Sequence, residues 1–414
     1  MTDLRRSWVG SANTPDTDFP LNNLPYGAFR SEDGSLHAGV AIGGSILDLT
    51  RLAQEGALAV PAGVFDSGQW NAFMALGPEA WGALRSYLTS ALAEGAEEQS
   101  TLEPYLLPMA GARLGMPFSV TEFTDFYAGR HHAFNVGSIF RDPANALPPN
   151  WLHIPIGYNG RASSVVVSGT DIIRPHGQLK SPDMDAPDFA PSRRFDLELE
   201  IGAIIGQPSH GPVSVQDADE MIFGYVLLND WSARDIQAWE YQPLGPFQAK
   251  ATATSISPWI VTSAALAPFR TSTPDREKPL LPYLQEPGPM LYEIDLEVRL
   301  APEGQTETVI SRTNYKEMYY SAAQQLAHHT SSGCPMRVGD LIGSGTISGP
   351  EKDSRGSLLE LSWAGQEPLT LDTGETRTFL EDGDVLTLRG AAHGVGYKVG
   401  FGACTGTILP AQRL

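Results

Sequence analysis

Two glutamates on one predicted strand have the spacing of a cation site. Residues 194–206 read RFDLELEIGAIIG, in which apolar and acidic residues alternate as they do along a β-strand. Glu198 and Glu200 are two residues apart and point to the same side, about 6.6 Å from each other along the strand. Two carboxylates at that spacing can converge on one hard cation.

The same pattern is also typical of a solvated strand face, and the chain contains a second example. Glu293, Asp295 and Glu297 alternate in the same way, and no motif near them suggests a site. Alternation therefore cannot separate a ligand set from a surface strand. On the residues alone, both interpretations of Glu198 and Glu200 stay open.

Asp230 is more informative because it ends the apolar run MIFGYVLLND at residues 221–230. A carboxylate at the mouth of a buried strand is costly unless it is paired or bound to a metal. Arg234 follows within one helical turn and could be a simple ion-pair partner, which is an equally good interpretation.

A histidine pair and an isolated lysine are the other candidates for chemistry. His131 and His132 are adjacent, so they cannot both reach one metal from a strand, and zinc sites on helices prefer an i, i+4 spacing. One of them could be a general base, and a hydrogen-bonded loop histidine is the alternative. Lys250 lies among small residues and could stabilise an oxyanion, or it could be an exposed loop lysine. The nucleotide-binding and serine-hydrolase motifs are absent.

The elements expected to position these residues are mostly strands. GVAIGGSILDLT at 39–50 predicts a hairpin around a Gly-Gly turn, and apolar periodicity predicts a helix within 70–95. Residues 313–330 predict a second helix, with Thr313 or Asn314 as its N-cap. Beyond a predicted domain boundary near residue 118, short strands separated by glycine turns dominate the sequence.

Composition sets limits on function. The 414 residues carry 28 lysines and arginines against 48 aspartates and glutamates, a net charge of −20, which disfavours nucleic acid and anionic membranes. Two cysteines are too few for a disulfide framework. No signal peptide and no stretch of about 18 apolar residues is present, so we expect a soluble cytoplasmic protein. With 42 glycines and 32 prolines, the chain favours a turn-rich β fold.

Long motifs resemble one family closely, the fumarylacetoacetases or fumarylacetoacetate hydrolases. The similar segments run nearly end to end and include TDFYAGRHHAFNVGSIFR (124–141), DLELEIG (196–202), NDWSARDIQAWEYQPLGPF (229–247), GDLIGSGTISG (339–349) and GYKVGFGACTG (396–406). Shorter members of the wider superfamily, which decarboxylate or isomerise related keto acids, share mainly the carboxylate motifs.

The resemblance implies a mostly β fold, with a small N-terminal SH3-like barrel domain (1–118) and a larger β-roll or β-sandwich catalytic domain with a few helices (119–414). It also implies a homodimer. The implied reaction is hydrolysis of the carbon–carbon bond of 4-fumarylacetoacetate to fumarate and acetoacetate, the last step of tyrosine and phenylalanine breakdown.

Residue by residue, the resemblance also implies a site. The active-site cation, Ca²⁺ or Mg²⁺, would be bound by Asp125, Glu198, Glu200 and Asp230. His132, oriented by Glu360, would be the base, and Arg234, Gln237 and Lys250 would be donors to the oxyanion and the substrate carbonyls. Further substrate contacts would come from Tyr127, Arg141, Tyr158, Tyr241 and Thr346.

One segment departs from the family pattern. Around its lysine the family has G-K-x-F-G-T, whereas this chain has AKATAT at 249–254, with alanine for both glycines and threonine for the aromatic residue. In the family this segment helps to bind a second, structural cation, here implied at Asp230, Lys250 and Thr254. If glycine were needed for positive φ or close approach, alanine would strain or reshape the loop.

Two alternatives to the implied reaction remain. The same fold and metal site could serve a hydrolase, decarboxylase or isomerase acting on a related acylpyruvate or β-diketo acid, which the altered 249–254 segment favours. The chain could also be a cation-binding protein without catalysis.

Overall fold

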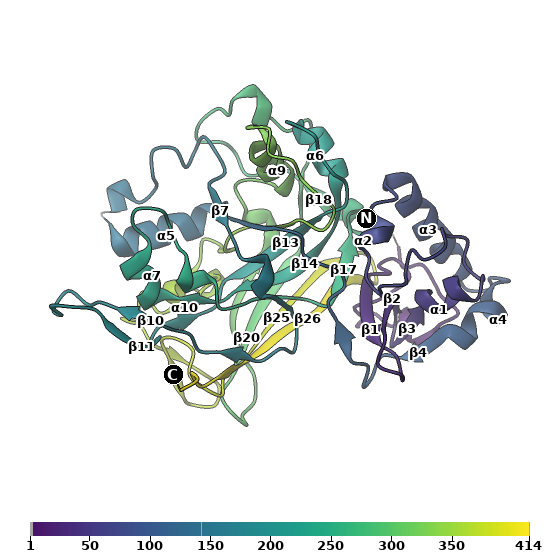
Figure 1. Cartoon of the computed structure of the whole chain (residues 1–414), viewed down its shortest axis with the longest axis horizontal. Helices are drawn as coiled ribbons and strands as arrows, with labels where there is room; N and C mark the ends of the chain where they lie inside the picture. Colours follow the sequence, from purple (N-terminus) through teal and green to yellow (C-terminus); the bar gives the residue numbers. More distant parts are fainter. Residues whose placement is uncertain (1–2, 142, 414) are drawn as a thin grey trace.

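The computed structural model describes residues 3–141 and 143–413, and its N-terminal strands lie at one end of the long axis (Figure 1). The hairpin expected at 39–50 is confirmed, since Gly43 and Gly44 join β2 to β3. The elements of this part are β1 (Tyr26–Arg30), β2 (Leu36–Ile42), β3 (Ser45–Asp48), β4 (Leu106–Pro108), β5 (Leu114–Gly115), α1 (Leu49–Gln54), α2 (Asn71–Met74), α3 (Pro78–Ala91) and α4 (Gln99–Leu102).

The large sheet continues from these strands into the rest of the chain. Its order in the described residues is β4-β3-β2-β1-β17-β14-β13-β22-β6-β7, with β5, β8 and β16 attached beside this path. The strands that follow the N-terminal part are β6 (Phe123–Phe126), β7 (Gly157–Asn159), β8 (Val165–Val167), β13 (Leu199–Ile205), β14 (Ile222–Asp230), β16 (Thr254–Ile256), β17 (Trp259–Thr262) and β22 (Leu341–Gly343). The predicted mostly β fold is confirmed, and the SH3-like closure of the N-terminal strands stays a prediction.

A second sheet packs against the first. Its order is β21-β20-β25-β26-β9, formed by β9 (Ile172–Ile173), β20 (Asp295–Ala301), β21 (Thr308–Asn314), β25 (Val385–His393) and β26 (Lys398–Leu409). At Gly390 of β25 the two sheets come so close that a Cβ atom would lie 2.8 Å from Leu227 of β14 in the large sheet, and it would also lie 2.9 Å from Leu296 of the neighbouring β20. These leucines belong to the larger buried core, whose close packing fixes the strand ends that carry the site.

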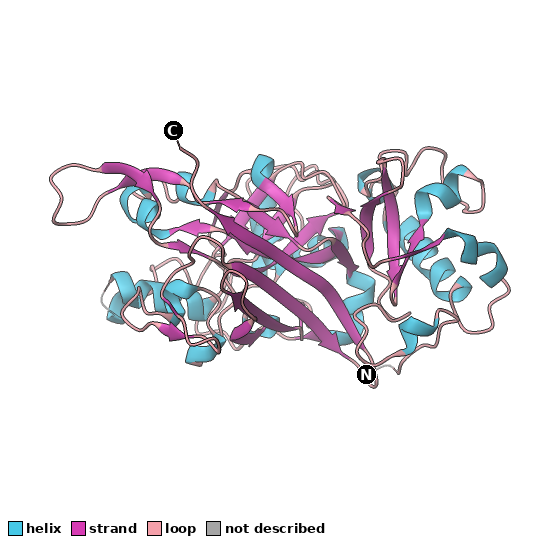
Figure 2. Ribbon diagram, turned by 90° about the horizontal axis from the view of Figure 1, so that it is seen from below, coloured by secondary structure: helices cyan, strands magenta, loops and turns pink. Residues whose placement is uncertain are grey.

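Short two-stranded pairs and helices complete this part of the molecule. The pairs are β10 (His176–Leu179) with β11 (Asp188–Pro191), β12 (Phe195–Asp196) with β15 (Ser232–Ala233), β18 (Arg270–Thr271) with β19 (Leu291–Tyr292), and β23 (Leu369–Thr370) with β24 (Thr376–Arg377). The helices are α5 (Arg130–Phe140), α6 (Val215–Met221), α7 (Arg234–Glu240), α8 (Ser263–Leu266), α9 (Ala322–Thr330) and α10 (Leu358–Leu361). The β10–β11 hairpin projects at the end opposite to the N-terminal strands (Figures 1 and 2).

The helix expected over 313–330 is shorter than predicted. Residues 308–314 form strand β21, and α9 begins only after Ser321, whose side chain accepts from the backbone N–H of Gln324 in a capping box. Asn314 caps a short 3₁₀ turn instead. The strand prevails because Thr313 and Asn314 pair with β20, a long-range contact that local periodicity does not contain.

The helix expected within 70–95 is interrupted. It divides into α2 and α3, because Gly77 between them has φ +89°, which ends one helix before Pro78 starts the next. In the described part of the chain, no helix has the length and apolar character needed to cross a membrane.

Candidate active site

Four carboxylates converge where the central strands of the large sheet lie side by side. Asp125 comes from β6, Glu200 from β13 and Asp230 from the end of β14, and Glu198 lies immediately before β13. All four side chains are buried, and one oxygen atom of each lies within 4.8 Å of those of the other three. The structure therefore brings together the four residues that the resemblance implied as metal ligands.

Sheet pairing explains this convergence. The backbone N–H of Asp230 donates to the carbonyl oxygen of Glu198 at 3.2 Å, so the end of β14 lies beside the start of β13. On the other side, β22 separates β13 from β6 and places Gly343 directly opposite Asp125. Residues far apart in sequence thus supply one site because their strands are neighbours in space.

The acid groups of the cluster differ in their electrostatic environment. Burial and the negative charge of Asp230 raise the pKa of Asp125 well above its ordinary value, and burial and Asp125 do the same to the pKa of Glu200. Burial alone would also raise the pKa of Glu198, but the cations of Lys250 and Arg234 outweigh it and hold that pKa below its usual range. Asp125 and Glu200 therefore lack a counter-charge of their own.

The space beside Asp125 and Glu200 fits a divalent cation. Among the described residues, Asp125 Oδ1 and Glu200 Oε1 are buried and have no hydrogen-bond partner. A Cβ atom at Gly343 would lie 2.4 Å from Asp125 Oδ1 and 3.1 Å from Glu200 Oε2, so glycine keeps this space clear. An anionic set of oxygen donors is what hard cations prefer. The cluster can hold a divalent metal ion.

Lys250 lies within the same cluster. Its ammonium contacts Glu198 Oε2 and lies 2.7 Å from Asp230 Oδ2, and Thr254 Oγ1 lies 3.4 Å from Asp230 Oδ1. The structure thus gathers the side chains of Lys250 and Thr254 around Asp230, where the lysine ammonium is a counter-charge. The second cation, for which the backbone carbonyl of Lys250 is an implied ligand, stays a prediction. Burial alone would lower the pKa of Lys250, but Asp230 and Glu198 raise it above its ordinary value, so the lysine stays charged.

The alanines of the altered segment do not strain the backbone. Among the described residues other than glycine, positive φ occurs only at Leu24, Trp363 and Ala364. Residues 249–254 therefore adopt conformations that alanine tolerates, so no residue of this loop is strained by a positive φ. A reshaping of the loop relative to the family stays a prediction.

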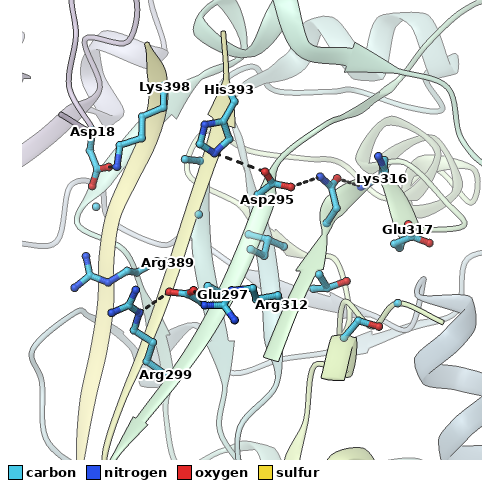
Figure 3. Close-up of a pocket in the computed structure, with 18 of the residues that line it drawn as sticks. Asp18, Asp295, Glu297, Arg299, Arg312, Lys316, Glu317, Arg389, His393 and Lys398 are labelled. Carbon is cyan, nitrogen blue, oxygen red and sulfur yellow. Dashed lines mark hydrogen bonds and ion pairs between the residues drawn. The ribbon is translucent and has the colours of Figure 1, made fainter. Parts of the chain in front are cut away.

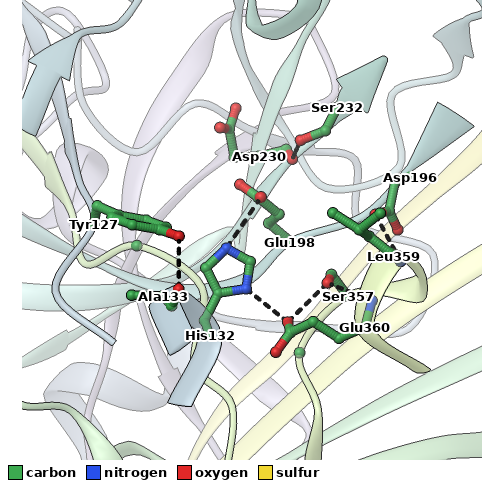
Figure 4. Close-up of polar contacts among 12 residues, drawn as sticks. Tyr127, His132, Ala133, Asp196, Glu198, Asp230, Ser232, Ser357, Leu359 and Glu360 are labelled. Atoms are coloured by element: carbon green, nitrogen blue, oxygen red, sulfur yellow. Dashed lines mark hydrogen bonds and ion pairs between the residues drawn. The ribbon is translucent and has the colours of Figure 1, made fainter. Parts of the chain in front are cut away.

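His132 forms a buried dyad with Glu360 next to the cluster (Figure 4). Its Nδ1 lies 2.6 Å from Glu360 Oε2, and its Nε2 lies 3.7 Å from Glu198 Oε1. Burial would raise the pKa of Glu360, but His132 and further donors outweigh it and lower that pKa. Since an ionised carboxylate only accepts, Nδ1 is the nitrogen that donates to Glu360, and Nε2 is the nitrogen that faces the cluster.

The neighbouring histidine points elsewhere. His131 Nε2 lies 3.6 Å from Glu317, away from the carboxylate cluster. The choice between the two histidines, which their sequence positions leave open, is made by the direction in which each leaves helix α5. His132 is the one that can exchange a proton with a molecule at the cluster.

Arg234 and Gln237 lie on the first turn of α7. The Arg234 Nε donates to Asp196 Oδ2 at 2.8 Å, Nη1 donates to Gln237 Oε1 at 3.2 Å, and Nη2 lies 2.8 Å from Glu198 Oε1. Burial would lower the pKa of Arg234, but Glu198 and Asp196 raise it. The simple ion pair between Arg234 and Asp230 is therefore wrong, because Arg234 pairs with Glu198 and Asp196.

Two of the implied substrate contacts, Tyr158 and Tyr127, lie beside the cluster and His132, and a third, Thr346, is buried. The Tyr158 hydroxyl lies within donating distance of Asp125 Oδ2 at 2.8 Å and of Asp230 Oδ2 at 2.9 Å. Tyr127 packs edge-to-face on the His132 ring, with centroids 5.4 Å apart. Thr346 is buried, and its hydroxyl has no hydrogen-bond partner among the described residues.

The other two lie further out. Arg141 is exposed just after α5, and its Nη2 donates to the Ala146 carbonyl at 2.7 Å. Tyr241 is exposed at the end of α7, and its hydroxyl accepts from Gln242. Neither touches the cluster.

Five residues of the site were not anticipated from the sequence: Asn135, Asp196, Gly343, Ser348 and Ser357. Asn135, Ser348 and Ser357 donate to Glu360 at 2.9, 3.0 and 2.8 Å. Ser357 had a local signal, because Ser-x-x-Glu is a capping pattern and Ser357 does cap the turn that carries Glu360. The others depend on contacts that only the tertiary structure makes.

The second acidic strand is a paired surface strand. Glu293, Asp295 and Glu297 do not converge, and their partners are Lys316 at 2.7 Å, His393 at 3.6 Å and Arg312 at 3.0 Å, respectively. A cleft of about 1130 Å³ with side chains of both charges lies over this sheet face (Figure 3). The interpretation of this strand as a surface strand is confirmed.

Comparisons with known proteins connect the chain to one family. Residues 22–117 match the family model described as "Fumarylacetoacetase N-terminal", and residues 121–409 match "Fumarylacetoacetate (FAA) hydrolase C-terminal". The chain is 48% identical to a protein named fumarylacetoacetase from Arabidopsis thaliana and 46% identical to one from Homo sapiens, in each case over 96% of this chain and 97% of the relative.

Solved structures show that the fold is shared more widely. A fumarylacetoacetate hydrolase from psychrophilic Exiguobacterium antarcticum superposes with a TM-score of 0.54 at 16% identity, covering 94% of this chain and all of that one. A 2-hydroxyhepta-2,4-diene-1,7-dioate isomerase from Mycobacterium marinum gives 0.50 at 17% identity with the same coverage. From the two family models and the relatives that match almost its whole length, the chain belongs to the fumarylacetoacetate hydrolase family.

Proposed function

We propose that this protein hydrolyses the carbon–carbon bond of 4-fumarylacetoacetate to give fumarate and acetoacetate, the last step of tyrosine and phenylalanine breakdown. The relatives named fumarylacetoacetase support the substrate. The observation that carries the proposal is the His132–Glu360 dyad, whose Nε2 faces a buried cluster of four carboxylates. The proposal includes a cytoplasmic homodimer, as the family resemblance implies.

His132 is the base in this proposal. Its Nε2 takes a proton from water, and Glu360 and Glu198 stabilise the imidazolium that forms. The water oxygen bonds to the carbonyl carbon beside the alkene. The bond from that carbon to the methylene between the two carbonyls then breaks, its electron pair forms the enolate of acetoacetate, and the proton held by His132 returns to the methylene carbon.

Lys250, Arg234 and Gln237 are the donors to the negative charge that develops. The Lys250 ammonium has three N–H groups and uses two on Glu198 and Asp230, so one remains. Arg234 likewise has more N–H groups than its partners occupy. Donors held in place by buried carboxylates need little rearrangement when the oxyanion forms.

Asp125, Glu198, Glu200 and Asp230 would hold the active-site cation, for which Ca²⁺ or Mg²⁺ suits an all-oxygen ligand set. When bound, the cation supplies Lewis-acid stabilisation of the diketone oxygens and of enolate charge. Tyr158 would keep Asp125 and Asp230 oriented through its hydroxyl. A second cation at Asp230, Lys250 and Thr254 stays a prediction.

The remaining contacts would bind the ends of the substrate. Arg141 has a guanidinium that can pair with a carboxylate through two parallel hydrogen bonds. Its exposed position outside the cluster suits recognition of a terminal carboxylate, and Tyr241 is also exposed there. Tyr127, whose ring packs on that of His132, and the buried Thr346 would contact the part of the substrate nearer the base.

Replacing the base tests the proposed reaction. We expect His132→Ala to lower kcat by about 10²- to 10⁴-fold while the affinity for the cation is retained, because His132 is not a ligand. Loss of the ultraviolet absorbance of 4-fumarylacetoacetate gives the rate, and NMR of the products identifies the reaction. His131→Ala is the matched control, with a rate near that of the unaltered protein. Release of CO₂, formation of an isomer, or no consumption of the diketo acid by the cation-loaded protein would contradict the proposal.

Filling the space at Gly343 tests the cation site. Gly343→Ala places a methyl group against Asp125 and Glu200, and we expect it to weaken Ca²⁺ binding by about tenfold or more. Calorimetric titration of the chelator-treated protein measures this affinity. Gly82→Ala is the control, because Gly82 lies on α3 and no atom would lie within 4 Å of a Cβ there. Equal Ca²⁺ affinities for the two variants would show that the cation binds elsewhere.

The cation should stabilise the protein more at higher pH. The raised pKa values of Asp125 and Glu200 mean that protonation stabilises the cation-free fold, and that this contribution is lost as pH rises through those values. A bound cation replaces these protons. The increase in melting temperature caused by Ca²⁺ should therefore be larger at about pH 8 than at about pH 6. Calorimetry at both pH values measures it, and an increase that shrinks with rising pH would rule out this proton competition.

A further inference from the structure

Asp196 is a buried carboxylate outside the four-carboxylate cluster, and it lies beside Leu359 (Figure 4). It accepts four hydrogen bonds. Its Oδ2 accepts from Arg234 Nε at 2.8 Å and from the backbone N–H of Leu359 at 3.0 Å. Its Oδ1 accepts from the backbone N–H groups of Leu358 and Leu197, both at 2.8 Å. Both oxygens of one side chain are therefore fully engaged.

The hydrogen-bond partners of Asp196 belong to two parts of the site, the turn that carries Glu360 and the side chain of Arg234. Leu358 and Leu359 begin the four-residue helix α10, and the next residue is Glu360, which holds His132. Arg234 holds Glu198 and Gln237. One carboxylate thus connects the turn that orients the base with the guanidinium that faces the cluster.

The turn that carries Glu360 needs support from outside. Directly after α10, Trp363 and Ala364 have φ values of 47° and 60°, in the left-handed region that residues other than glycine rarely adopt. Arg355 supports the C-terminal end of this turn, because its Nη1 donates to the Glu360 carbonyl at 2.9 Å and its guanidinium lies over the Trp363 ring. Asp196 supports the N-terminal end, because it accepts from the backbone N–H groups of Leu358 and Leu359.

We propose that Asp196 is a positioning residue that fixes the His132–Glu360 dyad and Arg234 relative to each other. Its catalytic consequence rests on the proposed function, whereas its effect on the geometry of the dyad does not. Asp196 is not placed to touch the reacting atoms, because all four of its hydrogen bonds go to Arg234 and to backbone amides. It acts through Glu360 and Arg234.

Asp196→Asn is the variant that tests this inference. The side chain keeps its size, but its NH₂ group must face Arg234 or the α10 amides, all of which are donors. We expect kcat for 4-fumarylacetoacetate to fall by about 10- to 100-fold, since small displacements of catalytic groups have effects of this size. Asp196→Glu keeps the charge but moves the carboxylate, and it provides the same comparison if the asparagine variant does not fold.

Asp384→Asn is the matched control. Asp384 is also fully buried, lies 2.9 Å from a guanidinium nitrogen of Arg377, and accepts from the backbone N–H of Glu381 at 2.8 Å. It forms the same kind of pair, but the hydrogen bonds and ion pair of its side chain in the described part of the chain go to Arg377 and Glu381 and not to the dyad or Arg234. A purely structural role for Asp196 predicts similar losses of stability and of kcat in both variants.

Two measurements separate positioning from general destabilisation. The proton of His132 Nδ1, shared with Glu360 at 2.6 Å, should give a far-downfield ¹H resonance that disappears in Glu360→Gln. We expect Asp196→Asn to shift or broaden this resonance and Asp384→Asn to leave it unchanged. In a Glu360→Gln background, Asp196→Asn should also lower kcat by a smaller factor than it does alone, because the two residues act through one turn.

The outcomes are distinct. An unchanged resonance, with kcat in Asp196→Asn no lower than in Asp384→Asn, would overturn the inference. If the unaltered protein does not hydrolyse 4-fumarylacetoacetate but the resonance moves only in Asp196→Asn, the proposed function fails and the positioning role of Asp196 stands.

Discussion

The interaction on which the site depends is the electrostatic repulsion among carboxylates that share one buried place. Asp125, Glu198, Glu200, Asp230 and the adjoining Asp196 are all buried, and the lysine and arginine side chains that pair with them among the described residues are Lys250 and Arg234. Five acidic groups against two basic ones leave a deficit of positive charge, and burying unpaired charge costs several kcal/mol per group. Protons or a divalent cation must compensate for it, and the raised pKa values of Asp125 and Glu200 show where the deficit lies.

The surrounding structure can be understood as the framework that keeps these charges together. Neighbouring strands bring the ligands into one place, Gly343 leaves room beside two of them, and close packing of the two sheets holds the strand ends. Glu198 has a special position because it contacts Lys250, Arg234 and His132 at once. Glu198 therefore links the proposed cation site to His132, the proposed base, and to Arg234 and Lys250, the proposed oxyanion donors.

The sequence predicted the ligands better than it predicted their support. Asp230 at the end of an apolar run had a local signal, whereas Glu198 and Glu200 could not be told from Glu293 and Glu297 without the family resemblance. The difference between the two strands is tertiary, since one is buried between sheet neighbours and the other forms ion pairs at the surface. Long motifs identified His132, because the direction of a side chain from a short helix has no local signature.

The supporting residues were missed for related reasons. A four-residue helix such as α10 is too short to be predicted from hydrophobic periodicity. The hydrogen bonds from its first two amides to Asp196 therefore could not be predicted from the sequence. The importance of Gly343 depends on what a Cβ atom would meet across the sheet. The helix predicted over 313–330 was too long because pairing of β21 with β20 overrides the local preference of its first residues.

If a divalent cation compensates for the charge of the buried carboxylates, anomalous diffraction can locate it. In crystals of the protein soaked in Mn²⁺, we expect an anomalous peak enclosed by the carboxylate oxygens of Asp125, Glu198, Glu200 and Asp230. A well-ordered site without such a peak, or a peak bound only by other residues, would contradict this expectation.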